Sequence, residues 1–172
     1  MAHQLEGFIG RHPSFRAALT SFQSARVVWL PQAFALLPLS DSFVVEVTEQ
    51  FGSARQLAHP EFLALTPALS LLGNELSLLT PTAYIETEYF GGHGSQGSIV
   101  WDLGRIVLGP LRTGELRDWE FSPLIDVPLH EGAINQALRY LGVIRAHGTD
   151  EFSALELGSR RWNDEWLATL AP

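Results

Sequence analysis

Two acidic residues and a glycine-rich polar stretch stand together near the middle of this 172-residue chain. Glu86 and Glu88 lie in TAYIETEYF (82–90), and His93 follows in GGHGSQG (91–97). Two carboxylates and an imidazole are groups that acid–base catalysis and metal binding use. If the carboxylates are buried, like charges this close would raise at least one pKa. The spacing therefore allows a hydrolase or metal-dependent enzyme that uses these three residues.

A binding surface is the other functional interpretation of the same segment. His93, Ser95 and Gln96 present polar groups on the connection between two apolar runs. Tyr84 and Phe90 share one strand face with the two acidic residues. Loops held by a rigid scaffold often carry binding residues. No third ligand has suitable spacing, so neither a metal site nor a cofactor is predicted.

The glycines themselves predict a hairpin connection. GGHGSQG matches neither GxGxxG nor a phosphate-binding loop with lysine, and the chain has no lysine at all. A strand, not a helix, is expected to follow it, whereas phosphate loops open into a helix. We therefore expect at least one glycine from Gly91 to Gly97 to have positive φ.

Other chemistry is excluded by composition. The absence of cysteine rules out thiolate nucleophiles, disulfides and cysteine-ligated metals. No GxSxG elbow and no HxH or HExxH spacing occurs. A net charge of -8 argues against nucleic acid and suits a basic protein partner. The longest apolar run is far below the ~20 residues that span a bilayer, and no signal peptide is visible, so a cytoplasmic protein without membrane contact is expected.

The elements that must position these residues follow from apolar periodicity and turn residues. Asp41, Thr66 and Asp150 are expected to cap helices, His130 and Glu131 to serve the N-terminus of another, and Gly142 to end that helix. In chain order they are a helix over 13–22, a hairpin over 25–38, helices over 41–52 and 66–80, strands over 82–90, 97–101 and 105–108, a loop over 109–128, and helices over 131–142, 150–158 and 159–170.

These elements predict one α+β domain over residues 1–172. Its antiparallel sheet has about five strands in two hairpin or meander units, with N- and C-terminal helices packed on it. The exposed edge of the meander offers a surface for a homodimer.

Three segments carry a resemblance to a known group of proteins: TEYFGGHGSQGSIVW, INQALRYLGV and DEFSALELGSRRWNDEWL. Over roughly residues 82–170, the chain resembles small bacterial proteins of GC-rich genomes. This resemblance implies an association with immunity or accessory components of toxin systems. It implies no activity and no catalytic residue. The leading interpretation is accordingly a non-enzymatic protein-binding domain, immunity- or inhibitor-like, and the alternative is the enzyme that uses Glu86, Glu88 and His93.

Overall fold

The computed structural model describes residues 2–52, 59, 61–90, 93–114 and 131–170. Its strands are β1 (His3–Arg11), β2 (Val28–Leu30), β3 (Phe34–Pro38), β4 (Thr82–Phe90), β5 (His93–Asp102) and β6 (Arg105–Gly114). Its helices are α1 (Ser14–Ala18), α2 (Asp41–Phe51), α3 (Pro67–Leu76), α4 (Ala133–Tyr140), α5 (Glu151–Ala154) and α6 (Asn163–Ala168). Within these residues, no helix is both long and apolar enough to cross a membrane.

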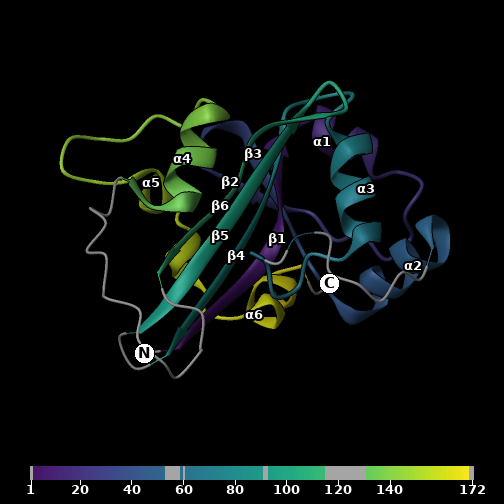
Figure 1. Cartoon of the computed structure of the whole chain (residues 1–172), viewed down its shortest axis with the longest axis horizontal. Coiled ribbons are helices and arrows are strands. Elements are labelled where there is room, and N and C mark those ends of the chain that lie inside the picture. The colour runs from purple at the N-terminus through teal and green to yellow at the C-terminus, as the bar shows by residue number, and fades with distance from the viewer. Residues whose placement is uncertain (1, 53–58, 60, 91–92, 115–130, 171–172) are drawn as a thin grey trace.

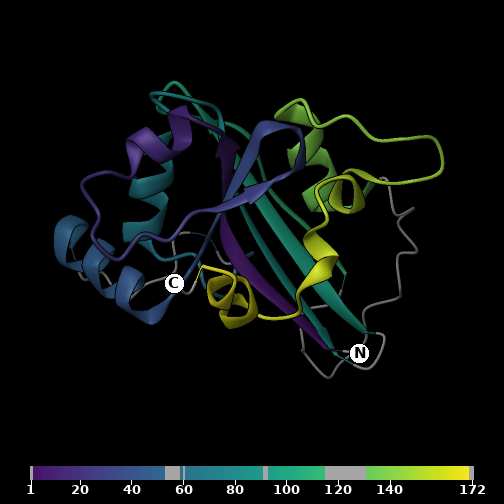
Figure 2. The same ribbon diagram turned by 180° about the vertical axis from the view of Figure 1, so that it is seen from behind.

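The strands form one antiparallel sheet in the order β2-β3-β1-β4-β5-β6. The sheet runs diagonally through the molecule, with α1, α2 and α3 on one face and α4 and α5 on the other (Figure 1). The same two helix layers are seen from behind in Figure 2. The predicted α+β class is therefore confirmed, with six strands where about five were expected.

Each face of the sheet has its own hydrophobic core. On the α1–α3 face, the core includes Phe8, Tyr84 and Trp101. On the other face, Ile85 and Val100 pack with side chains from the C-terminal helices. Both faces of the central strands are therefore covered, and alternation along the sequence does not separate a buried face from a solvent face.

The predicted caps show why several helices begin where they do. The Thr66 hydroxyl accepts a hydrogen bond from the Leu69 N–H at 3.2 Å, and Pro67 stands at the first position of α3. At α5, the Asp150 carboxylate accepts from the Ser153 N–H at 2.8 Å. For α2 the capping side chain is Ser40, one residue before the Asp41 that the sequence suggested.

β1 is the strand that the sequence did not predict. Gly7 and Gly10 lower the strand propensity of this segment. Both glycines stand where neighbouring groups come close. A Cβ at Gly7 would lie 2.6 Å from the Leu37 carbonyl oxygen, and one at Gly10 would lie 2.4 Å from the Phe15 ring. The glycines are therefore needed to bring β1 against β3 and α1.

β6 is longer than the predicted strand over 105–108. It continues through Gly109 and Pro110 to Gly114, although the sequence indicates a loop there. Gly109 has φ of 92°, and the register with β5 shifts between Ser98 and Val100. Gly109 and Pro110, which look like a strand end in the sequence, thus lie in a β-bulge, and the strand continues beyond them. β6 is an edge of the sheet among the described residues, and its pairing with a second copy stays a prediction.

The C-terminal segment bonds to the part of β1 that β3 does not pair with. β1 pairs with β3 from Gly7 onward, and the Gln4 N–H donates to the Arg161 carbonyl at 2.7 Å. The Asn163 side-chain amide lies next to Glu6, where the pairing of β1 with β3 ends. Its Oδ1 accepts from the Glu6 N–H, and its Nδ2 donates to the Glu6 and Leu39 carbonyls, each at 2.9 Å. The side chain thereby bonds the Glu6 N–H and the Leu39 carbonyl, and it adds a second donor to the Glu6 carbonyl, which also accepts from the Leu39 N–H at 3.0 Å.

Candidate functional site

Glu86 is the most deeply buried of the predicted acidic residues, with 4% of its surface exposed. Its Oε1 accepts from the Leu63 N–H at 2.8 Å, and its Oε2 accepts from the Ala64 N–H at 3.2 Å. The Tyr84 hydroxyl donates to Oε2 at 3.2 Å, and Arg112 Nη1 lies 3.5 Å from Oε1. Both oxygens are therefore held by protein groups, and the carboxylate fastens the 61–65 segment to the sheet.

Burial dominates the ionisation of this carboxylate. It raises the pKa of Glu86, and the hydrogen bonds from Leu63, Ala64 and Tyr84 and the charge of Arg112 only partly offset it. Burial, followed by the charge of Glu86, also raises the pKa of the Tyr84 hydroxyl. The raised Glu86 pKa was expected for a buried pair of acids, but its main cause is desolvation rather than repulsion from Glu88.

Arg112 is the functional partner that the sequence did not single out. From β6 it reaches across β5 and donates to the Ser95 hydroxyl, the Glu61 carbonyl and the Glu86 carboxylate. Its side chain is 11% exposed, and its Nε has no hydrogen-bond partner among the described residues. Residues 109–114 look like a loop in the sequence, so nothing there indicated that this arginine faces Glu86.

A cavity of about 210 Å³ lies beside Glu86, between the sheet and the 61–65 segment. It is lined by Gln4, Glu6, Leu63, Glu86, Glu88 and Ser95, among others. Glu6 is the direct cross-strand partner of Glu86, and Gln4 is that of Glu88. We call this feature the acidic cavity. Three carboxylates on two adjacent strands line it. Arg112 offsets the charge of Glu86, so Glu6 and Glu88 are the acids that give the cavity a negative field that suits a cation.

His93 does not lie beside Glu86. It opens β5 as the cross-strand partner of Phe90, whereas Glu86 is opposite Gly97. Four residues along the strand separate His93 from the level of Glu86, which is about 13 Å. No group of three His, Cys, Asp or Glu side chains in the described ranges could hold a metal ion. The predicted cluster is thus divided between a buried carboxylate and an exposed imidazole.

The aromatic members of the predicted binding surface also separate. Tyr84 is fully buried and packs edge-on against Phe8 and Phe62, with ring centroids 5.2 and 5.6 Å apart. Phe90 is 68% exposed near the hairpin end. Tyr84 therefore belongs to the core, and Phe90 is the aromatic side chain that solvent or a ligand reaches.

Gln96 and Ser95 point to opposite faces of the sheet, as neighbours in a strand must. Gln96 Oε1 accepts from the Ile134 N–H at 3.0 Å, and the Thr113 hydroxyl accepts from the Ala133 N–H at 3.1 Å. These bonds satisfy the first turn of α4, whose own N-cap, Gly132, has no side chain to do so. The sequence suggested that His130 and Glu131 serve this helix end; His130 lies outside the described residues.

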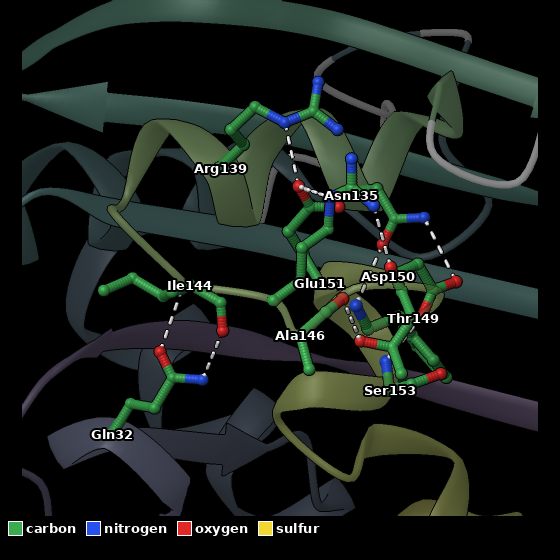
Figure 3. Close-up of polar contacts among 11 residues, drawn as sticks. Gln32, Asn135, Arg139, Ile144, Ala146, Thr149, Asp150, Glu151 and Ser153 are labelled. Carbon is green, nitrogen blue, oxygen red and sulfur yellow. Dashed lines mark hydrogen bonds and ion pairs between the residues drawn. The ribbon is translucent and has the colours of Figure 1, made fainter.

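A second cavity of about 190 Å³ lies on the Gln96 side, between the β4–β5 hairpin and the helices α4 and α5. Tyr89, Gln96, Ile134, Asn135, Asp150 and Phe152 contribute to its walls. Figure 3 shows how Asn135 and Asp150 approach each other, with Ser153 beside them. We call this feature the tyrosine pocket. The sequence suggested only Gln96 of these residues, because the others come from separate segments.

His3 lies beside this pocket, and its pKa gives a pH prediction. The Leu5 N–H donates to the Thr87 hydroxyl at 2.9 Å, which leaves the hydroxyl proton for His3 Nδ1 at 2.8 Å. Burial lowers the pKa of His3 from 6.5, and the bond to the Leu157 carbonyl only partly offsets this. As the pH is lowered below 6.5, His3 is protonated more readily in the unfolded chain than in the folded protein. The free energy of unfolding therefore decreases as the pH decreases.

We expect the melting temperature of the wild type to fall more steeply between pH 7 and pH 5 than that of a His3→Asn variant. Asparagine keeps an acceptor for the Thr87 hydroxyl but does not titrate. Thermal unfolding followed by circular dichroism at several pH values measures both slopes. Equal slopes would show that the pKa of His3 does not differ between the folded and the unfolded chain.

Comparison with known proteins finds no relative of this chain. The chain matches no protein-family model, no curated protein sequence and no solved structure.

Proposed function

We propose that the chain is a cytoplasmic, non-enzymatic binding protein that recognises a basic protein partner through the acidic cavity. The observation that carries this proposal is the set of three carboxylates, Glu6, Glu86 and Glu88, that lines one cavity between adjacent strands. The net charge of the whole chain, -8, has the same sign. An arginine or lysine side chain of a partner is the group that such a surface attracts.

The bonding of Glu86 favours binding over catalysis. An acid–base catalyst needs a carboxyl oxygen that can reach the proton of a substrate. Both oxygens of Glu86 are instead occupied by Leu63, Ala64, Tyr84 and Arg112. Glu86 therefore acts as a fixed, hydrogen-bonded wall of the cavity, and the less buried Glu6 and Glu88 face the partner.

An immunity- or inhibitor-type role follows from the same features. Inhibitors that block a basic surface need a rigid acidic face, and here the carboxylates stand on paired strands rather than on a free loop. Binding driven by such charges is fast and weakens as salt rises.

Affinity capture with three matched baits tests the proposal. The baits are the wild type, a Glu6→Gln/Glu88→Gln variant and a Glu49→Gln/Glu75→Gln control, in which two exposed carboxylates of α2 and α3 are removed. Each bait is used on extract of the source cell and on co-expressed products of neighbouring genes. We expect a stoichiometric basic protein that is held by wild type and control, released by salt, and lost with the cavity variant.

Two results would contradict the proposal. The absence of any stoichiometric protein partner under both conditions would count against a binding protein. Equal capture by all three baits would place the contact away from the acidic cavity. Both variants lose two negative charges. A difference in capture between them therefore reports the role of the cavity carboxylates and not the change in net charge.

A hydrolase or metal-dependent enzyme is the alternative proposal, and the raised pKa of the Glu86 carboxyl beside a cavity is the observation in its favour. Metal analysis of the purified protein and hydrolysis assays on the Glu88→Gln and His93→Ala variants test it. Stoichiometric metal, or an activity that either change abolishes, would support this alternative.

A further inference from the structure

The tyrosine pocket lies on the opposite face of the sheet from the acidic cavity, so it is independent of the proposed function. It is enclosed by the hairpin end of β4 and β5 on one side and by α4 and α5 on the other. A volume of about 190 Å³ corresponds to roughly six water molecules. The pocket is therefore large enough for a small organic molecule.

One hydrogen-bond donor in this pocket is fixed by its neighbours. The Ile134 N–H donates to Gln96 Oε1 at 3.0 Å, and this fixes which way the Gln96 amide points. Gln96 Nε2 therefore faces the Tyr89 hydroxyl, which accepts from it at 3.1 Å. Among the described residues, the Tyr89 hydroxyl donates to no acceptor. Its proton is thus available to a ligand oxygen in the pocket.

One acceptor is fixed in the same way. Asp150 Oδ1 accepts from the Ser153 N–H at 2.8 Å, and Oδ2 is 3.4 Å from Asn135 Nδ2. Burial alone would raise the pKa of Asp150, but the hydrogen bonds from Ser153 and Asn135 together lower it, so the carboxylate is charged. A carboxylate offers about four acceptor positions, so Asp150 keeps capacity for a further donor.

The charge of Asp150 is not matched by a nearby cation. The neighbouring Glu151 is paired with Arg139 Nε at 2.8 Å (Figure 3). It is also paired with Arg145 Nε at 3.5 Å. No such ion pair to Asp150 exists among the residues that the structure describes. Within the described part of the chain, the pocket therefore has one uncompensated negative charge, and Ile134 and Phe152 give it apolar walls.

We propose that the tyrosine pocket binds a small amphipathic amine that carries a hydrogen-bond acceptor oxygen. The ammonium group donates to Asp150, the oxygen accepts from Tyr89, and the apolar part packs against Phe152 and Ile134. An amino-acid amide has these three features, whether it is free or is the first residue of a peptide.

Three probes separate the contributions of these groups. Leucinamide has the amine, the oxygen and an apolar side chain; isoamylamine lacks the oxygen; N-acetylleucinamide lacks the charge. Titration followed by amide chemical shifts of the ¹⁵N-labelled full chain gives the affinities. We expect leucinamide to bind at least tenfold more tightly than N-acetylleucinamide, the usual effect of one hydrogen bond to a charged group, and about threefold more tightly than isoamylamine, the usual effect of one neutral hydrogen bond. Tighter binding of a Leu-Gly-Gly tripeptide would identify a peptide N-terminus as the source.

Asp150→Asn is the deciding variant. Asparagine caps a helix as well as aspartate does, so α5 keeps its N-terminal bond while the charge is removed. We expect leucinamide to bind at least tenfold more weakly to Asp150→Asn and unchanged to Asp41→Asn, which removes an exposed carboxylate at the start of α2. Tyr89→Phe should weaken leucinamide and leave isoamylamine unaffected.

The proposal is overturned if leucinamide produces no shift changes around Tyr89, Gln96 and Phe152, or if Asp150→Asn binds it as the wild type does. Equal affinity for N-acetylleucinamide would likewise overturn it, because recognition of the cation is its central claim.

Discussion

Replacing Glu86 by alanine is expected to lower the free energy of unfolding by about 4 kcal/mol, the size of effect seen when one partner of a buried ion pair is removed. The loss is large because four donors depend on this carboxylate. The Leu63 and Ala64 N–H groups, the Tyr84 hydroxyl and the Arg112 guanidinium would all lose an acceptor. Urea denaturation of the wild type and the variant measures the difference.

Two further variants define the cause of this loss. Glu86→Gln keeps the shape, but its amide NH₂ group must face one of two backbone N–H donors, so we expect a loss of about 2 kcal/mol. Glu6→Gln, opposite Glu86 in register and with a hydrogen bond from Gln4, should change stability by less than about 0.5 kcal/mol. A Glu86→Ala variant as stable as Glu6→Gln would show that the carboxylate does not hold the 61–65 segment.

Gly94→Ala is expected to destabilise the fold by about 3 kcal/mol through overpacking. A Cβ at this position would lie 2.0 Å from the Glu88 carbonyl oxygen and 2.6 Å from the Tyr89 Cα. These are backbone atoms of the paired strand, so the contact is relieved only if β4 and β5 move apart. Gly97→Ala should cost less, about 1 to 2 kcal/mol, because its Cβ would meet the Phe62 side chain at 2.9 Å.

His93→Ala is the matched control in the same strand. Its side chain is exposed, and we expect its urea midpoint to equal that of the wild type. If His93→Ala and Gly94→Ala lose the same stability, the imidazole is a structural anchor and the glycine does not act through close packing.

The reason for these glycines differs from the one that the sequence suggested. The pattern predicted positive φ for at least one glycine between Gly91 and Gly97. Gly94 and Gly97 do not have it, and Gly91 and Gly92 lie outside the described residues, so a positive φ in this segment stays a prediction. The strand begins at His93 rather than at Gly97, so glycine is required for close approach rather than for a turn.

Local signals predicted a large part of the architecture. The hairpin over 25–38, the strand over 82–90, the Thr66 and Asp150 caps and the α4 stop at Gly142, with φ of 87°, are all present. Each depends on residues within a few positions of one another, through side-chain capping, proline at a first turn or the left-handed conformation of glycine. Such features can be predicted from the sequence alone because the interacting groups are neighbours in the chain.

The candidate sites depended on contacts between distant segments. Alternation alone places Tyr84, Glu86 and Glu88 on one face of a strand, and the structure agrees. It does not say that both faces of β4 are covered, that the segment around Leu63 closes over Glu86, or that Arg112 arrives from a strand with a bulge. Burial decides whether a carboxylate is a solvated charge or a fixed, hydrogen-bonded wall. Burial is a property of the packed chain, because desolvation comes from atoms that lie far away in sequence.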